Sequence, residues 1–590
     1  MCSEQLENDK NMIEKKRHSA AHILAMTILD MHPDAKLGVG PAIDNGFYYD
    51  VKTNEPITED ELKKIEKKMK KLISQNITFE KNVLSIDEAR KKFADAGQEY
   101  KVEMIDDLAK EGEEHVSIYT SKDFDDLCRG PHVDNTKEIN AKALKVTRLS
   151  GAYWKSDENH DQLTRVYGVL FDTKEDLDTY LTKIEEAKKR DHRKLGKELD
   201  LFTFSDLVGA GLPLFTPKGT LLRDLIVEKI QNFQSEFGYS KVTIPHITKK
   251  ELYETSGHWE KFGDDLFKVK GQSNQEFVMK PMNCPHHTQI FASRPHSYKD
   301  LPVRFMEATM VYRDEQAGEL LGLSRVRSIS QDDGHVFCTP EQIEEEVRNI
   351  VTVIRRFYTS LEMFTEGDYW VSVSIRDPKT PEKYLGDEKK WTDAETILEN
   401  IAQKENLDYK RVEGEAAFYG PKLDFMFKDA LGREWQLATA QLDFVMPERF
   451  NLEYTDENGE KHTPVMIHRA IAGSLERFLS VIIEHFAGAF PFWLSPVQVA
   501  VIPVSDKFND YGQSVVDTCT ASGIRAELSN ESETLGKRIR AAQNEKIPYM
   551  LIVGEKEMTD KTVSVRTRKN GDEGVEKVEN LLKKLIEKNQ

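Results

Sequence analysis

The sequence lacks several features that would place it in a familiar class. Among its 590 residues there is no uninterrupted apolar stretch of about 18 residues, the length that a membrane-spanning helix requires. The first residues, MCSEQLENDKNMIEKKRHS, carry charges where a secretion signal has an apolar core. We therefore expect a cytoplasmic protein without a membrane partner.

Cysteine is scarce, and the five cysteines form no CxxC pair; they are Cys2, Cys128, Cys284, Cys338 and Cys519. This spacing argues against a disulfide framework and against a local zinc finger. The phosphate-binding patterns GxxxxGK[ST] and GxGxxG are also absent, so other groups would have to hold a nucleotide. The net charge of −19 argues against sequence-blind binding to nucleic acid, and we expect no DNA partner.

The chain is long enough for several domains and has the hydrophobic share of a globular protein, 39%. Residues 1–172 mix short strands with an amphipathic lysine-rich helix, which indicates an α+β domain. The charged, periodic run 173–199 predicts a linker helix. Residues 200–493 carry consecutive strands and long helices, which favours an antiparallel sheet flanked by helices. Residues 494–590 alternate strands with helices, which predicts a small α/β domain with a mainly parallel sheet.

Two arginines draw attention: Arg313 in MVYRDEQ and Arg325 at the start of RVRSISQDDGH. Arg313 ends one strand-like segment and Arg325 begins the next, so a hairpin with its loop at 315–322 would bring both guanidinium groups to one sheet face. Such a pair is suited to clamping phosphates. From the residues alone, an alternative stays open: these arginines are solvated or paired with nearby acids such as Glu307.

Five blocks, in order and spacing, resemble the threonyl-tRNA synthetase family of class II aminoacyl-tRNA synthetases. They are KPMNCPHH, YRDEQ…GLSRVRSISQDDGH, FYGPKLDF, ATAQLDF and PVMIHRAIAGSLERF, and the similarity extends from about His18 to the C-terminus. The resemblance implies an α+β multidomain protein with an editing domain at 1–172, a class II catalytic domain with an antiparallel sheet at 200–493, and an α/β anticodon-binding domain at 494–590.

The implied reaction is the ligation of L-threonine to tRNA(Thr) through a threonyl-adenylate made from ATP, with Mg²⁺ accompanying the ATP. The family assigns catalysis to Arg313 and Arg477, which fits the need to stabilise charge that builds on the α-phosphate. The implied ATP-binding set is Arg313, Glu315, Arg325, Gln436, Thr439, Gly473 and Arg477.

The resemblance also implies one zinc ion per subunit, bound by Cys284, His335 and His468. These residues are far apart in the chain, and without the resemblance each would be interpreted as part of the core. Three protein ligands leave zinc an open position. The hydroxyl group of threonine could bind there, whereas valine, an isostere without a hydroxyl group, could not. The implied threonine pocket is Gln331, Asp333, Tyr419, Lys422 and Gln441.

Serine would also reach the zinc ion, because it has the same hydroxyl group as threonine. It lacks only a methyl group, whose loss is worth roughly 1–3 kcal/mol of binding free energy. A second, hydrolytic site is therefore expected. HSAAH places His18 and His22 four residues apart on one helix face, and CRGPH gives Cys128 and His132 the same spacing. The resemblance assigns the editing of mischarged Ser-tRNA(Thr) to His18, His22, Asp126, Cys128 and His132. We expect this site to be free of metal, although the residues alone leave a four-ligand zinc site open.

The resemblance assigns the reading of the tRNA anticodon to Asn530, Lys546, Glu557 and Arg566; surface charges without a role are the alternative. The helix expected at 221–237, followed by GYSKVTIPHI, is similar to the class II dimerisation motif and implies a homodimer.

Three departures from the family pattern are expected to matter. Only seventeen residues precede His18, so we expect no N-terminal ubiquitin-like domain. Ile329 stands where an aromatic residue usually stacks on adenine, and Leu321 stands where histidine is frequent. Two alternatives stay open: another class II synthetase, such as a prolyl or seryl enzyme, and a regulatory protein derived from a synthetase.

Overall fold

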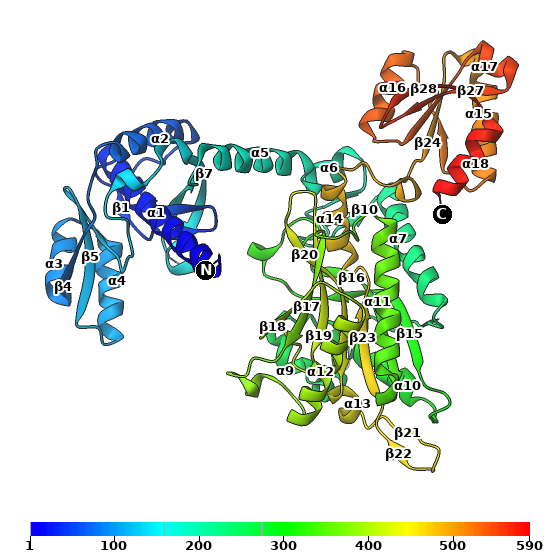
Figure 1. The fold of residues 1–590 in the computed structure, drawn as a ribbon, viewed down its shortest axis with the longest axis horizontal. Helices are drawn as coiled ribbons and strands as arrows, with labels where there is room; N and C mark the ends of the chain where they lie inside the picture. Colours follow the sequence, from blue (N-terminus) through cyan, green and yellow to red (C-terminus); the bar gives the residue numbers. More distant parts are fainter. Residues whose placement is uncertain (1, 158–159, 273–274, 590) are drawn as a thin grey trace. The chain divides into compact units, whose positions relative to one another are not determined.

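The computed structural model describes residues 2–157, 160–272 and 275–589, and it divides the chain into two compact units, Met1–Glu185 and Glu186–Gln590 (Figure 1). Within these described residues, we find no helix with both the length and the apolar character needed to span a bilayer.

The first unit is an α+β structure with two sheets. The long helix α1 packs on β3 and β8 of the larger sheet, whose order is β1-β3-β8-β7, and α3 and α4 cover the smaller sheet, β4-β5-β6. The elements are α1 (Cys2–Met31), β1 (Lys36–Leu37), β2 (Ala42–Ile43), β3 (Gly46–Lys52), α2 (Glu59–Ile73), β4 (Glu80–Ser85), α3 (Ile86–Asp95), α4 (Glu99–Lys110), β5 (His115–Ser121), β6 (Phe124–Leu127), β7 (Leu144–Tyr153) and β8 (Gln162–Leu170).

The run expected to form one linker helix forms two, α5 (Lys174–Arg190) and α6 (His192–Glu198). The break falls at Asp191, whose side chain accepts a hydrogen bond from the Arg193 N–H at 2.8 Å and caps α6. Aspartate at such a position satisfies a free N–H group of the first helical turn, so it favours a new helix start over continuation.

The second unit contains an eight-stranded sheet in the order β11-β15-β16-β23-β20-β19-β17-β18. Its pairs are antiparallel except the outermost two, β11–β15 and β17–β18, which confirms the predicted sheet type. The largest core lies between this sheet and the helices α7, α11, α12 and α14. The elements are α7 (Pro217–Ser235), β11 (Ser240–Lys241), β12 (Ile247–Lys249), α8 (Lys250–Ser256), α9 (His258–Phe262), β13 (Lys268–Lys270), β14 (Glu276–Met279), α10 (Cys284–Ala292), β15 (Val303–Tyr312), β16 (Ser328–Cys338), α11 (Ile343–Ser360), β17 (Tyr369–Ile375), α12 (Glu388–Lys404), β18 (Tyr409–Glu413), β19 (Lys422–Lys428), β20 (Glu434–Asp443), α13 (Val445–Arg449), β23 (Val465–Ala470) and α14 (Leu475–His485).

The predicted hairpin of β15 and β16 is present, but its connection is longer than expected. Both Arg313 and Arg325 lie in this connection, because β15 ends at Tyr312 and β16 begins at Ser328. The connection closes on itself through a small turn, in which the Ser324 N–H donates to the Leu321 carbonyl at 2.9 Å.

The C-terminal part of the second unit is a mixed sheet in the order β25-β24-β26-β27-β28. The expectation of a mainly parallel sheet is wrong, because β26–β27 and β27–β28 are antiparallel. The segment before the last helix forms the second strand of a hairpin, which begins at Gly571. The φ of +77° at Gly571 suits the tight turn between the two strands. The elements are β24 (Val499–Pro503), α15 (Asn509–Ala521), β25 (Ala526–Leu528), α16 (Leu535–Asn544), β26 (Tyr549–Val553), α17 (Glu555–Asp560), β27 (Thr562–Thr567), β28 (Gly571–Lys577) and α18 (Val578–Lys588).

Candidate functional site

Strand register brings the three predicted metal ligands together. His335 on β16 lies directly opposite His468 on β23, and Cys284 begins helix α10 beside them. His335 Nε2 and His468 Nδ1 are 3.1 Å apart, and one ligand atom from each of the three residues lies within 4.8 Å of the others. A thiolate and two imidazoles form a donor set that zinc prefers.

The outer nitrogen of each imidazole has a side-chain partner. His335 Nδ1 lies 2.7 Å from His287 Nδ1, and His468 Nε2 lies 2.9 Å from Asp443 Oδ2. These partners orient the two rings so that His335 Nε2 and His468 Nδ1 face the centre of the cluster, as second partners do in metal sites.

All three ligands are buried, and burial shifts the pKa of two of them. It lowers the pKa of His335 well below its ordinary value and raises the pKa of the Cys284 thiol well above its own. His335 is therefore neutral and ready to bind a metal, whereas Cys284 would lose its proton on binding.

The two adjacent aspartates have different partners. Asp332 accepts hydrogen bonds from the buried Arg469 at 2.8 Å and from the backbone of Ile471 and Ala472, which fixes the turn after β23. Asp333 points to the other face of the strand, where Asn283 Nδ2 donates to it at 3.0 Å. Burial raises the pKa of Asp333, and it outweighs the hydrogen bond from Asn283, which lowers it.

A cavity of about 280 Å³ lies beside the metal cluster, along β16, β20 and the start of α14. Its walls include all seven residues predicted to bind ATP, namely Arg313, Glu315, Arg325, Gln436, Thr439, Gly473 and Arg477. Ile329, the residue found in place of an aromatic one, also lines this cavity, whereas Leu321 is half-exposed on the loop.

The cavity concentrates positive charge. Burial lowers the pKa of Arg313 and that of Arg477, and the charge of Arg477 lowers the pKa of Arg313 further. The charge of Arg325 lowers the pKa of Arg477 in the same way. Arg325 is also paired with Glu315 and Glu319, so the predicted alternative of arginines paired with nearby acids holds for this residue. The repulsion of Arg477 by Arg313 and by Arg325 still suits the cavity to a polyanion, because the charge of the polyanion relieves it.

Of the residues predicted to bind threonine, two line the cavity and two others lie against the candidate metal ligands. Gln331 and Gln441 line the cavity, and Gln441 is the cross-strand partner of His468. The Tyr419 hydroxyl donates to Gln441 at 2.6 Å, and the Tyr419 ring stacks on His468 with 4.8 Å between ring centroids. Lys422 is committed to an ion pair with Asp424 at 2.9 Å.

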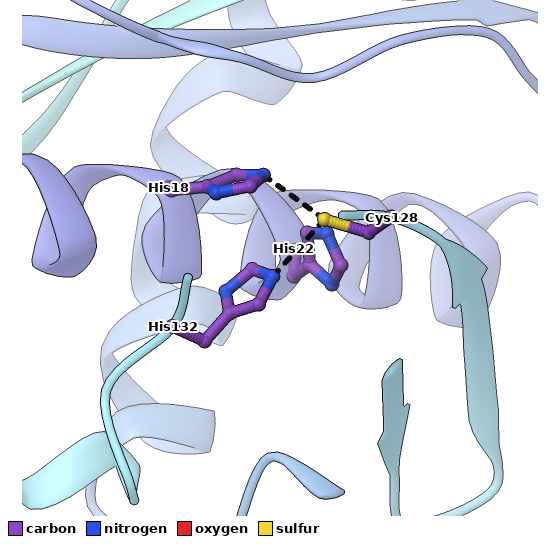
Figure 2. Close-up of side chains that lie close together, drawn as sticks. All are labelled: His18, His22, Cys128 and His132. Carbon is purple, nitrogen blue, oxygen red and sulfur yellow. Dashed lines mark hydrogen bonds between the residues drawn. The ribbon is translucent and has the colours of Figure 1, made fainter. Parts of the chain in front are cut away.

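The first unit brings its own predicted cluster together (Figure 2). Cys128 Sγ lies 3.3 Å from His18 Nε2 and 3.3 Å from His132 Nε2, and His22 completes a group of four possible ligands. Burial raises the pKa of the Cys128 thiol to about 11 and lowers the pKa of the three histidines. Without a metal, the sulfur is therefore a thiol and the imidazoles are neutral.

The sequence interpretation missed Tyr49 and Lys101 of this region, which both contact the predicted residue Asp126. Asp126 Oδ2 lies 3.4 Å from His22 Nε2, and its carboxylate also receives the Tyr49 hydroxyl at 2.5 Å and the Lys101 ammonium at 2.6 Å. Lys101 is only 2% exposed, on the same face of α4 as the buried Ile105. A lysine on the apolar face of an amphipathic helix was the available signal.

The second unit also holds two histidines that the sequence interpretation missed, His258 and His287. His258 is buried, with Nε2 3.7 Å from Cys284 Sγ, and His287 contacts His335 as described above. Both are surrounded by aromatic residues, which is the usual setting of a core histidine, so the sequence offered no separate signal.

The four predicted anticodon residues do not form one group. Asn530 and Glu557 follow the carboxyl ends of the parallel strands β25 and β26. Lys546 precedes β26, and Arg566 pairs with Met550 near the start of that strand. The set is therefore divided between the two ends of a short sheet.

Comparison with protein families matches three segments of the chain. Residues 116–167 match the model described as "Threonyl and Alanyl tRNA synthetase second additional domain", residues 267–486 match "tRNA synthetase class II core domain (G, H, P, S and T)", and residues 498–588 match "Anticodon binding domain". Together with the antiparallel sheet and the arginine-lined cavity, these matches define a class II aminoacyl-tRNA synthetase, an enzyme that uses ATP and binds tRNA.

Individual relatives narrow the class. A threonine–tRNA ligase of Gloeobacter violaceus is 48% identical over 99% of this chain and 93% of its own, and one of Porphyromonas gingivalis is 48% identical over 97% and 87%. The crystal structure of the RNA-binding domain of threonyl-tRNA synthetase from Cryptosporidium parvum superposes with a TM-score of 0.63 at 38% identity, covering 67% of this chain and 97% of that one. The chain belongs to the threonyl-tRNA synthetase family.

Proposed function

We propose that this chain ligates L-threonine to tRNA(Thr) and hydrolyses Ser-tRNA(Thr). The observation that carries the proposal is the adjacency of two sites: an arginine-lined cavity shares strands β16 and β20 with the surroundings of a buried group of one thiol and two imidazoles. The first suits a nucleotide triphosphate, and the second suits an ion that tests for a hydroxyl group.

In the activation step, the carboxylate of threonine attacks the α-phosphorus of ATP and pyrophosphate leaves. Arg313, from the β15–β16 connection, and Arg477, from α14, would hold the α- and γ-phosphates, and Arg325 would add a third guanidinium group. The Arg477 Nε–H donates to the Ser324 carbonyl at 3.2 Å, and a donor held in place in this way favours stabilisation of the charge that develops. Mg²⁺ would accompany the pyrophosphate.

The Cys284, His335 and His468 group fits one zinc ion per subunit, because its three donors are softer than those that Mg²⁺ or Ca²⁺ selects. When bound, zinc would supply a fourth position that the amino and hydroxyl groups of threonine could occupy. Asp333 would accept a hydrogen bond from the N–H of the zinc-bound amino group, and the walls around the amino acid would be formed by Gln331, Tyr419, Lys422 and Gln441.

We assign the editing reaction to the first unit and to a set of residues without metal. A four-ligand zinc site is closed and leaves no position for a substrate. The neutral His18, His22 and His132 instead offer acceptors for the protons of an attacking water molecule, and the Asp126–Lys101 ion pair fixes one wall of the site.

Further proposals concern partners and organisation. A homodimer is supported by exposed apolar side chains clustered in one segment, of which Leu207 is fully exposed; the others are Phe204, Val208 and Leu214.

The residues proposed to contact the anticodon of tRNA are Asn530, Lys546, Glu557 and Arg566. We propose boundaries at 1–172 for editing, 173–199 for the linker, 200–493 for catalysis and 494–590 for anticodon binding. We propose a cytoplasmic location, where tRNA and ATP are both present.

ATP–pyrophosphate exchange tests the proposal. We expect exchange with threonine, and none with proline; serine should be activated weakly. Arg477→Ala should reduce the exchange rate by about 10²–10³, the usual effect of removing a donor to a developing anion. Exchange that depends on proline, or on serine better than on threonine, would assign the chain to another amino acid.

A further inference from the structure

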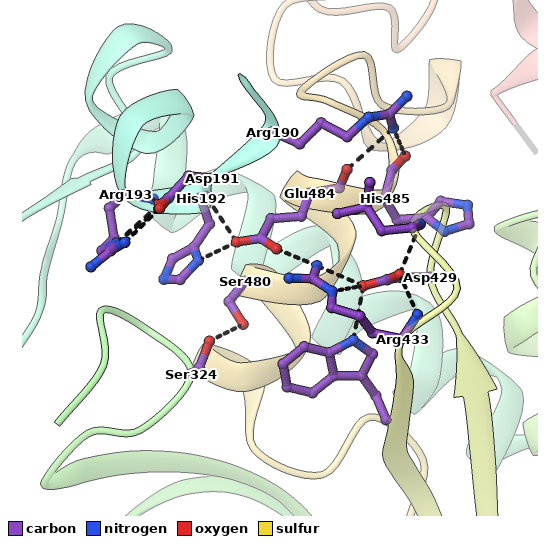
Figure 3. A network of polar contacts seen from close by, with 12 residues as sticks. Arg190, Asp191, His192, Arg193, Ser324, Asp429, Arg433, Ser480, Glu484 and His485 are labelled. Atoms are coloured by element: carbon purple, nitrogen blue, oxygen red, sulfur yellow. Dashed lines mark hydrogen bonds and ion pairs between the residues drawn. The ribbon is translucent and has the colours of Figure 1, made fainter. Parts of the chain in front are cut away.

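His192, at the start of α6, connects three elements of the catalytic unit (Figure 3). Its Nδ1 lies 2.7 Å from Glu484 Oε1 on α14, and its Nε2 accepts the backbone N–H of Leu323 at 3.0 Å. Leu323 belongs to the connection between β15 and β16, the same connection that supplies Arg325 to the cavity. His192 is 4% exposed, so both contacts are formed away from water.

The partners of the ring fix its tautomer. A backbone N–H can only donate, so Nε2 of His192 has to be the unprotonated nitrogen, and Nδ1 carries the proton that Glu484 accepts. Glu484 is held in turn by Arg433, which also binds Asp429, as Figure 3 shows. The acceptor that faces Leu323 is therefore fixed in direction by a chain of ionic contacts behind it.

The residues that follow Leu323 face the cavity. The Ser324 carbonyl accepts from Arg477 Nε at 3.2 Å, and its hydroxyl donates to Ser480 Oγ at 2.9 Å. Arg325, the next residue, binds Glu315 at 2.6 Å and Glu319 at 2.8 Å. Three consecutive residues therefore have successive partners: Leu323 contacts His192, Ser324 contacts helix α14, and Arg325 contacts two glutamates.

We propose that His192 is a positioning residue for the nucleotide: through the Leu323 N–H it fixes the loop segment that places Arg325 and the backbone contact of Arg477. The inference rests on the proposed role of these arginines in binding ATP. Gly322 supports it, because a Cβ atom at this position would lie 2.2 Å from His192 Nε2, and its φ is +50°. The loop approaches the ring as closely as only glycine permits.

Two substitutions separate the two contacts of the ring. The amide of glutamine reaches the place of Nε2 and offers an oxygen to Leu323, whereas the shorter asparagine reaches the place of Nδ1 and serves only Glu484. We expect His192→Asn to raise the KM for ATP in pyrophosphate exchange by about tenfold, equivalent to about 1.4 kcal/mol. His192→Gln should stay within about threefold of the wild type, and the KM for threonine should change by less than about twofold in both.

Hydrogen exchange of residues 316–326 in the full chain gives a second readout, which should be faster in His192→Asn than in His192→Gln. Lys194→Ala is the matched control, because Lys194 is an exposed residue of the same helix and lies 3.9 Å from Glu198. If the histidine variants do not fold, Gly322→Ala tests the same contact from the loop side and should also raise the KM for ATP.

The inference is wrong if His192→Gln raises the KM for ATP as much as His192→Asn does, or if neither variant nor Gly322→Ala changes it. The first result would mean that the pairing with Glu484 is what matters. A separate failure is recognisable: if Arg477→Ala leaves the KM for ATP unchanged, the assignment of the cavity to ATP is wrong.

Discussion

The two Cys/His clusters of this chain use the same residue types and differ in number, burial and support. Cys284, His335 and His468 are three donors, each no more than 5% exposed, and the two rings are held from behind by His287 and Asp443. The other cluster has four donors at a partly exposed site. There, His18 is held by the Pro131 carbonyl at 3.2 Å, His132 by the Ser19 hydroxyl at 3.0 Å, and His22 lies 3.4 Å from the Asp126 carboxylate.

The difference shows how similar side chains are set up for different tasks. A carboxylate behind an imidazole raises its basicity and its affinity for a metal, and a carbonyl or hydroxyl does so less. Asp443 does this at 2.9 Å for one of two rings in the buried group, and Asp126 lies at the longer distance of 3.4 Å from one of three rings in the other group. Three donors leave a tetrahedral ion one free position, and four leave none. This difference fits our proposal, in which the buried group would hold an ion that a substrate can reach and the partly exposed group would transfer protons at a water molecule.

The largest effect is expected for the amino acid itself. If the buried group holds an ion that binds the hydroxyl of threonine, valine should be activated roughly 10⁴-fold less efficiently, because a site built for a hydroxyl rejects the isostere without one. Exchange kinetics with threonine, serine and valine measure this ratio, with serine expected between the other two. Equal use of valine would remove the distinction between the two clusters.

A smaller but still large effect is expected at the four-donor cluster. The double variant His22→Ala plus Cys128→Ala should deacylate Ser-tRNA(Thr) about 10²–10⁴-fold more slowly, the range typical of lost acid–base groups, while threonine activation stays normal. Mischarged tRNA should then accumulate in aminoacylation assays with serine. Cys519→Ala, a buried cysteine outside both clusters, is the control. Unchanged deacylation in the double variant would contradict the editing assignment.

The contact of Asp443 with His468 gives a third prediction, with a smaller expected effect. In Asp443→Asn, the oxygen that caps α13 through Val445 and Met446 can remain, but an N–H group would face His468 Nε2. We expect metal affinity, measured by competition with a chelator, to fall about 10–100-fold. The free energy of unfolding measured without metal should change little. An unchanged affinity would mean that the backing of the ring does not distinguish the clusters.

Local pattern predicted much of the architecture, and long-range register could not be predicted. The amphipathic helix that became α2 and the succession of strands in the catalytic unit follow from periodicity. The pairing of His335 with His468 depends on how β16 and β23 align, 133 residues apart in the chain (468 − 335), which no periodicity encodes. Only the family resemblance pointed to that pair.

The errors have local causes. The single linker helix was predicted from charge periodicity, which does not register that Asp191 caps a new helix. The parallel character of the C-terminal sheet was overestimated, because a strand with the composition GDEGVEK has few β-branched residues and was not recognised. Lys101, Tyr49 and His258 were missed because a side chain that contacts a site from a distant element leaves no motif.

Metal analysis of the active, untreated enzyme tests the central claim most directly. The account predicts one zinc ion per chain in the wild type and in the His22→Ala plus Cys128→Ala variant, and none in Cys284→Ala, which should also have lost threonine activation. Active wild-type enzyme without metal, or a metal that remains in Cys284→Ala and disappears from the double variant, would contradict it.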